Sequence, residues 1–217
     1  KSALLSGLYP RESSAALRTR ITDITTDLRA LPRKEYYNAI FQTTPSPANA
    51  AMNRYFTLEF FNSAASLLKP GGLLVFQLPC AANYLPPEKA YSIASVLAAA
   101  GRTFPSITLI PGDRLIVLAG VKTPDLTPGK LADTYYLRGL KTLAVVPSAF
   151  PFILDPSRRK WAEHELEKVT DAPLNSDLSP LAYFHFWRAW LSMVMSPAAL
   201  LGLVALSLGA LCAALAL

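Results

Sequence analysis

The chain has 217 residues, the length of one domain or of one domain with an appendage. Hydrophobic residues make up 52% of it, a high share for a soluble protein, and the formal net charge is +6. No basic helix face interleaved with aromatic residues accompanies that charge, so we exclude nucleic-acid binding. The two cysteines, Cys80 and Cys212, predict neither a disulfide framework nor a metal site.

The first predicted elements are a strand and the helix that follows it. Residues 37–43 form a short apolar run that ends in a loop rich in threonine, serine and proline. Thr57 can cap the next helix, and Glu59 in its first turn suits the positive end of the helix dipole. The apolar residues of this helix recur at the spacing of one buried face: Phe60, Phe61, Ala64, Ala65, Leu67 and Leu68. Residues 69–72, Lys-Pro-Gly-Gly, are predicted to end it.

A second strand is predicted at residues 73–78, which are almost all apolar, as in a strand buried on both faces. A strand, a helix and another strand in this order predict a parallel pair, which is half of a nucleotide-binding α/β sheet. Ligands of such sheets bind beyond the carboxyl ends of the strands, so we expect chemistry in the loops after Thr43 and Leu78. Gln77, a polar residue near the end of a buried strand, is predicted to make a structural hydrogen bond or to contact substrate.

The later elements include an antiparallel hairpin. We predict helices over residues 88–100, 131–140 and 158–169, strands over 107–110 and 115–121, and a loop over 171–180. The two strands are joined by Pro-Gly-Asp-Arg, which favours a tight turn. His164 lies on a charged helix and His185 lies in an aromatic cluster typical of a membrane interface, so we predict a catalytic role for neither.

These motifs together resemble the spermidine synthase family, aminopropyltransferases built on the fold of AdoMet-dependent methyltransferases. The likeness is carried by the loop at residues 43–47, Phe-Thr-Leu-Glu-Phe-Phe at 56–61, Lys-Pro-Gly-Gly at 69–72, and Gln77. The sequences at 53–57, 111–114 and 175–177 are similar to the membrane-embedded branch of the family. The resemblance implies an α/β fold: a partial methyltransferase-like (Rossmann-like) sheet with a C-terminal antiparallel hairpin, followed by a transmembrane helix.

The resemblance also implies the site. In the family, two acidic residues in the loop after the first strand orient and deprotonate the attacking amine and hold the polyamine. Here those positions are Thr43 and Ser46, and a hydroxyl neither accepts a proton near neutral pH nor pairs with an ammonium. Decarboxylated AdoMet is the implied co-substrate, with Gln77 in the site, Asp27 against the adenine and no metal. Asp27 is equally suited to cap a short helix.

The carboxyl-terminal residues 198–217 contain no charged residue. A helix of this length spans about 30 Å, the thickness of a bilayer core, so a transmembrane helix is predicted. Basic residues at 158–160 and at Arg188 precede it, which places the α/β domain on the cytoplasmic side of a bacterial inner membrane. Small residues recur along one face and suit contact with another transmembrane helix of the same or a partner chain: Gly202, Ala205, Gly209, Ala213 and Ala216.

We predict three regions: a partial α/β domain at residues 1–145, a connector at 146–183, and an aromatic segment with a transmembrane helix at 184–217. No glycine-rich cofactor loop is found in the sequence, so the amino-terminal half of the fold is expected to be missing or eroded. The single span that ends at the last residue and the abrupt start at Lys1 predict a fragment of a longer, multi-span protein. Two functions remain open. One is a spermidine synthase-like membrane protein that transfers an aminopropyl group to a polyamine. The other is a catalytically degenerate membrane-anchored domain that binds a ligand or serves a transport-like bundle.

Overall fold

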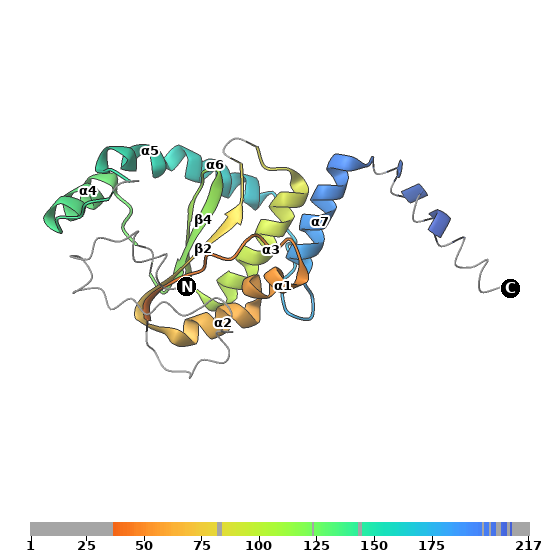
Figure 1. The fold of residues 1–217 in the computed structure, drawn as a ribbon, viewed down its shortest axis with the longest axis horizontal. Helices are drawn as coiled ribbons and strands as arrows, with labels where there is room; N and C mark the ends of the chain where they lie inside the picture. The colour runs from red at the N-terminus through yellow and green to blue at the C-terminus, as the bar shows by residue number, and fades with distance from the viewer. Residues whose placement is uncertain are drawn as a thin grey trace, which may run out of the picture. The chain divides into compact units, whose positions relative to one another are not determined.

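The computed structural model describes residues 37–81, 84–122, 124–142 and 145–196, and then 198, 199, 201, 202, 205–207 and 209. The chain divides into two units, Lys1–Leu31 and Pro32–Leu217, and all of these residues belong to the second. The elements in chain order (Figure 1) are β1 (Tyr37–Phe41), α1 (Ala50–Asn53), η4 (Arg54–Phe56), α2 (Leu58–Leu67), β2 (Leu68–Pro79), α3 (Pro87–Thr103), β3 (Ser106–Ile110), β4 (Arg114–Gly120), α4 (Pro128–Leu137), η5 (Pro147–Ala149), α5 (Phe150–Ile153), α6 (Pro156–Glu167) and α7 (Leu181–Val194).

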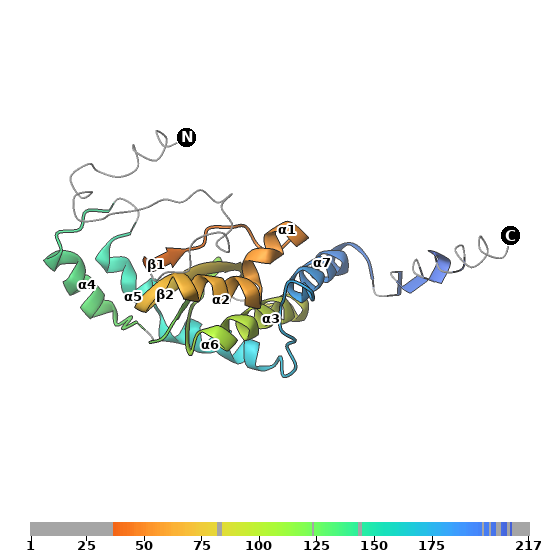
Figure 2. The same cartoon turned by 90° about the horizontal axis from the view of Figure 1, so that it is seen from below.

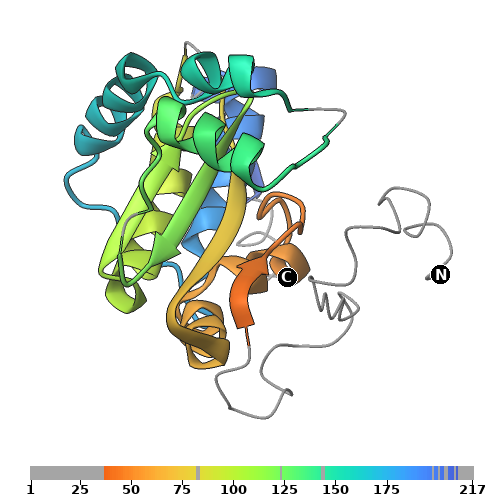
Figure 3. The ribbon, with the colours of Figure 1, turned by 90° about the vertical axis from the view of Figure 1, so that its left-hand side faces the viewer.

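The four described strands form one mixed sheet in the order β1-β2-β4-β3 (Figure 3). Strands β1 and β2 are parallel, with Phe41 opposite Val75, and β4 runs antiparallel to both of its neighbours. Both the parallel pair and the late hairpin were predicted from the sequence, and both are confirmed. The α/β fold class is therefore confirmed as well.

The junction of α2 and β2 differs from the prediction. Helix α2 ends at Leu67, and Leu68 already belongs to β2, which is longer than the predicted strand of residues 73–78. The pairing with β1 is irregular here, because Tyr37 lies opposite Leu68 but Ala39 lies opposite Leu73. Gly71 has φ +78°, a left-handed conformation that side chains other than glycine rarely adopt. The Lys-Pro-Gly-Gly motif thus makes a sharp bend within the start of the strand rather than a separate turn.

The core lies between the sheet and helices α2 and α3. Because side chains alternate along a strand, Leu74, Phe76 and Leu78 of β2 point to one face, where all three are buried. Phe61 of α2 packs on Phe76 with ring centroids 5.3 Å apart. Buried residues of α3, the neighbour of α2, complete this layer. Figure 2 shows α2 and α3 along the sheet, with α7 beside α3.

Each of the three predicted helices after β2 begins with a proline, which explains why the predicted starts were late. Helices α3, α4 and α6 begin at Pro87, Pro128 and Pro156, one to three residues before the predicted positions. Proline suits the first position of a helix because its missing N–H has no partner there in any case. The side chain of Asp155 caps α6 by accepting a hydrogen bond from the Ser157 N–H at 2.9 Å.

The predicted transmembrane helix is not confirmed. No helix among the described residues is both long enough and apolar enough to cross a membrane. Of residues 198–217, positions 200, 203, 204, 208 and 210–217 lie outside the described residues. The region boundaries predicted near residues 145 and 183 both fall within the second unit and stay predictions.

Candidate functional site at the strand ends

The loop after β1 places the two family positions at the carboxyl end of the parallel strands. The Gln42 N–H donates to the Val75 carbonyl at 2.8 Å, so the strand pairing continues one residue beyond β1. Gln42 and Thr44 are buried, whereas Thr43 between them is exposed. Ser46 is half-buried, and its carbonyl accepts a hydrogen bond from the Ala48 N–H at 2.6 Å. Of the two family positions, Thr43 is therefore the more accessible one.

Gln77 lies near the carboxyl end of β2, next to the strand that leads into Thr43. The register pairs Phe41, the last residue of β1, with Val75, and Gln77 follows two residues later on β2. Gln77 is half-buried and lies opposite Ile116 of β4. Its side chain shares the face of Val75, away from the core between the sheet and α2 and α3. The backbone thus brings Thr43 and Gln77 to the same end of neighbouring strands, although a shared pocket stays a prediction.

Gln42 is a polar residue of this loop that the sequence analysis did not single out. Its Nε2 donates to Thr44 Oγ1 at 2.8 Å, and its Oε1 is buried without a hydrogen-bond partner among the described residues. The two amide ends are interchangeable in assignment, so either a donor or an acceptor lacks a partner here. In the sequence, the only sign of this residue is that a polar glutamine interrupts the apolar run of residues 37–43.

Buried Asn175 binds the residues that connect the loop after β1 to α2. Asn175 is fully buried, and its Nδ2 donates to Asn53 Oδ1 at 3.1 Å and to the Phe56 carbonyl at 2.8 Å. Its Oδ1 accepts from the Ala182 N–H at 3.1 Å, and its own carbonyl accepts from the Leu58 N–H at 2.9 Å. The loop before α7 is thereby joined to the segment that carries the candidate site into α2.

Residues at the start of α2 extend this junction. Thr57 caps the helix as predicted, accepting from the Phe60 N–H at 3.4 Å. Its hydroxyl lies 2.8 Å from Asp177 Oδ1 and 3.2 Å from the Arg54 carbonyl, and its single proton favours the shorter contact. Glu59 accepts from the Asp177 N–H at 3.0 Å. Glu59 therefore has two roles: its carboxylate lies in the first turn of α2, and it binds the 175–177 segment by a hydrogen bond.

The chain is similar in sequence to a known aminopropyltransferase. No protein-family model matches the chain. A polyamine aminopropyltransferase from Corynebacterium efficiens is 33% identical over 169 residues, a match that covers 74% of this chain. The chain belongs to the spermidine synthase family. It spans 32% of the length of that relative. A probable spermidine synthase from Corynebacterium glutamicum aligns with a TM-score of 0.42 and 16% identity over 72% of this chain and 53% of the other.

The loop after β1 differs from the acidic pattern that the family resemblance implies. Residues 43–47 contain no acidic residue, and their side-chain polar groups are hydroxyls. Asp27, predicted to lie against the adenine, is outside the described residues. The structure therefore gives positions for Thr43, Ser46 and Gln77 but not for the proposed adenosine contact.

The cysteine after β2 is half-buried. Burial raises the pKa of the Cys80 thiol, while a backbone hydrogen bond with Ala81 and the positive charge of Lys89 oppose that shift. The thiolate is the nucleophilic form of cysteine, and a raised pKa disfavours that form.

The two histidines differ in their surroundings. His164 is exposed on α6, as predicted. His185 stacks on Tyr91 of α3 with ring centroids 5.4 Å apart, and its Nδ1 is buried without a partner among the described residues. Burial lowers the pKa of His185 below its usual 6.5, and Arg188 lowers it further, while Glu88 acts in the opposite direction. The packing of α7 on α3 therefore favours a neutral imidazole.

We expect acidification below about pH 6.5 to destabilise the protein, because the unfolded chain binds a proton that the folded His185 resists. The stabilisation is complete above pH 6.5 and is lost as the pH falls toward the lowered pKa. Urea midpoints at pH 7.5 and 5.5 measure this, and a His185→Phe variant should have a smaller difference between them. A His164→Phe control should keep the full difference. An undiminished pH effect in His185→Phe would refute the assignment.

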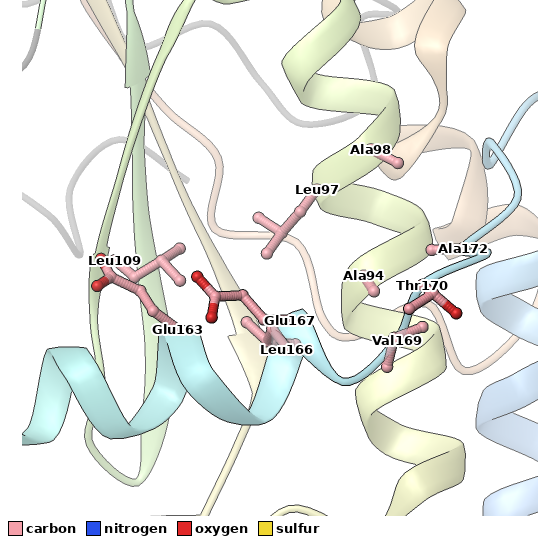
Figure 4. A pocket seen from close by; sticks show the side chains of 10 residues that line it. All are labelled: Ala94, Leu97, Ala98, Leu109, Glu163, Leu166, Glu167, Val169, Thr170 and Ala172. Atoms are coloured by element: carbon pink, nitrogen blue, oxygen red, sulfur yellow. The ribbon is translucent and has the colours of Figure 1, made fainter.

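An open groove lies beside α3 and α6 (Figure 4). It has a volume of about 430 Å³ and is bounded by α3, β3, α6 and the residues after α6. Leu97 and Leu109 form part of its apolar wall, and Glu163 and Glu167 stand one helical turn apart on α6. None of the predicted site residues lines it. The groove is therefore separate from the candidate site.

Proposed function

We propose that this chain supplies the amine side of an aminopropyl-transfer site in which hydroxyls replace the usual carboxylates, so that transfer to a polyamine is slow or lost. The reaction would join a polyamine nitrogen to the propyl carbon next to the sulfonium of decarboxylated AdoMet. A C–N bond forms, the C–S bond breaks, methylthioadenosine leaves, and the nitrogen gives up a proton. A proton acceptor beside the amine therefore governs the rate.

The observation that carries this proposal is the loop geometry after β1. Thr43 is exposed two residues after β1, and Gln77 lies near the carboxyl end of the parallel partner β2, the end of such sheets where ligands bind. Threonine and serine hydroxyls can donate to and accept from an amine, but they carry no negative charge for an ammonium. Gln77 can orient a ligand by hydrogen bonds and likewise adds no charge. The site retains positioning groups without a base.

The alternative is a domain that keeps the family fold and binds a ligand without catalysis. The absence of acidic residues from positions 43–47 favours it. The family assignment favours retained group transfer, because the motifs from Phe56 to Gly72 are intact. A polyamine is the ligand that the relative's name suggests for both readings.

The side of the site that would hold decarboxylated AdoMet is not built from the described residues. Among the described residues of 37–142 the glycines lie at a strand bend, at the end of β4, near helix ends and in turns, and no glycine-rich loop follows a strand. Nothing in the described part of the chain is therefore assigned to the adenosine. The amine side can be tested separately.

We further propose that residues 198–217 anchor the protein in a membrane, with the α/β domain on the cytoplasmic side. The twenty uncharged residues and the basic residues before them support this. Carbonate washing of membranes tests it, because a spanning segment resists extraction and a peripheral one does not. Recovery of the full-length protein in the carbonate supernatant would contradict the proposal.

The transfer proposal predicts little or no spermidine formation. The full-length protein, incubated with decarboxylated AdoMet and putrescine, should release methylthioadenosine about 10² to 10⁴ times more slowly than an enzyme with a general base. The C. efficiens relative, assayed in parallel, is the positive control. Turnover equal to that of the control would show that a base outside residues 43–47 serves the reaction.

A further inference from the structure

Helix α7 has an apolar face that no described residue covers. Phe184, Trp187, Trp190 and Val194 are 54%, 50%, 55% and 64% exposed, respectively. Their spacing of three, three and four residues places them along one side of the helix. We call these four residues the α7 stripe. The other side of α7 packs on α3, where Ala182 is fully buried and its carbonyl accepts a hydrogen bond from Ser92 Oγ at 2.9 Å.

The composition of the α7 stripe suits a lipid surface. Tryptophan and phenylalanine gather at membrane–water interfaces, and arginine reaches toward lipid phosphates there. Arg188 is exposed on α7, and the helix contains no acidic residue. The net charge of +6 favours anionic lipids over neutral ones. Residues 198–217, uncharged throughout, begin four residues after α7 ends, so any bilayer that takes up that segment lies next to the stripe.

A second copy of the chain is a poorer occupant. From the 150–250 Å² that an aromatic side chain can bury, the four half-exposed side chains offer roughly 400–500 Å². A stable interface needs about 800 Å² on each partner. A helix lying in the headgroup region, by contrast, requires only one apolar face and a polar opposite side.

We propose that α7 lies in the interface of an anionic bilayer, with the α7 stripe among the headgroups and upper acyl chains. The inference deepens the membrane association proposed for residues 198–217 and depends on it. It adds a second contact, which fixes the rotation of the α/β domain on the membrane because α7 is packed on α3. The candidate site at the strand ends would then face the bilayer in one orientation rather than swing on a flexible tether.

Tryptophan fluorescence tests this directly, because the sequence contains three tryptophans and only Trp187 and Trp190 belong to the α7 stripe. The full-length protein with Trp161→Phe is reconstituted in phosphatidylcholine–phosphatidylglycerol vesicles whose acyl chains are brominated near the headgroup or near the bilayer centre. We expect blue-shifted emission and quenching, stronger with the shallow bromines. The matched protein with Trp187→Phe and Trp190→Phe retains only Trp161 of α6 and should be unquenched.

A second pair of variants separates the stripe from general effects. Phe184→Gln with Val194→Gln should reduce the quenching of Trp187 and Trp190, whereas Leu137→Gln, at an exposed position on α4, should not. Flotation with vesicles reports the membrane association of residues 198–217 independently. Flotation without quenching would overturn the α7 inference alone. Failure to float would overturn both proposals, and a concentration-dependent blue shift without lipid would identify a second copy as the occupant.

Discussion

Replacing Asn175 with alanine should lower the free energy of unfolding by about 3–5 kcal/mol, since each buried group left without a partner costs about 1–3 kcal/mol. The Asn175 side chain is fully buried and makes three hydrogen bonds, to Asn53, Phe56 and Ala182. The substitution removes all three hydrogen bonds and leaves a small cavity. The decrease in the free energy of unfolding should therefore be large for the replacement of a single polar residue. Urea unfolding followed by circular dichroism measures it.

The control is a second asparagine whose hydrogen bond is exposed. Asn62 accepts from Thr103 Oγ1 at 2.7 Å on the surface, so Asn62→Ala should change stability by less than about 0.5 kcal/mol. Asn175→Asp keeps the shape but replaces the two N–H donors facing Asn53 and Phe56 with an acceptor. At pH 7 the Asn175→Asp variant should have a free energy of unfolding at least as low as that of Asn175→Ala. If Asn175→Ala were as stable as the unmodified protein, the hydrogen bonds of Asn175 would not stabilise the fold.

The local pattern of the sequence was sufficient to predict the sheet. The cap at Thr57 is set by neighbours within a few residues, and the parallel pair follows from a helix between two apolar strands. The apolar run of β2 predicted burial on both faces, but its fully buried residues alternate along the strand, so only one face belongs to the core. The helix starts were predicted late because the spacing of apolar residues ignores the first turn. Prolines such as Pro128 begin the helix there without contributing to an apolar face.

The junction around Asn175 could not be predicted in the same way. Its partners Asn53 and Phe56 are 122 and 119 residues away, and nothing local to the 171–180 loop indicates that the loop is tied to the start of α2. The same limit applies to the candidate site. Family motifs indicated which positions matter, but only the sheet topology showed that the loop of Thr43 and the end of β2 at Gln77 belong to neighbouring strands.

Restoring both acidic positions should create polyamine binding. In a Thr43→Asp, Ser46→Asp variant, two carboxylates stand where the family has them, and each charge-assisted hydrogen bond to an ammonium is worth roughly 1.5–3 kcal/mol. If the two act independently, putrescine should bind about two to four orders of magnitude more tightly than to the unmodified protein. Thr43 is exposed and Ser46 half-buried, so neither carboxylate is forced into the core. Calorimetry with putrescine on both proteins measures the change.

The matched control is Thr43→Asn with Ser46→Asn, which has the same shape without the charge and should bind putrescine no better than the unmodified protein. Ala50→Asp adds a carboxylate at the exposed start of α1, near the loop but outside the family positions, and separates a specific contact from a general gain in negative charge. Added salt should weaken the putrescine binding, because Thr43 is exposed and charges at exposed positions are screened by salt. If the aspartate variant binds no more tightly than the asparagine variant, residues 43 and 46 do not face an amine site, and the likeness of the loop to the family extends only to its sequence.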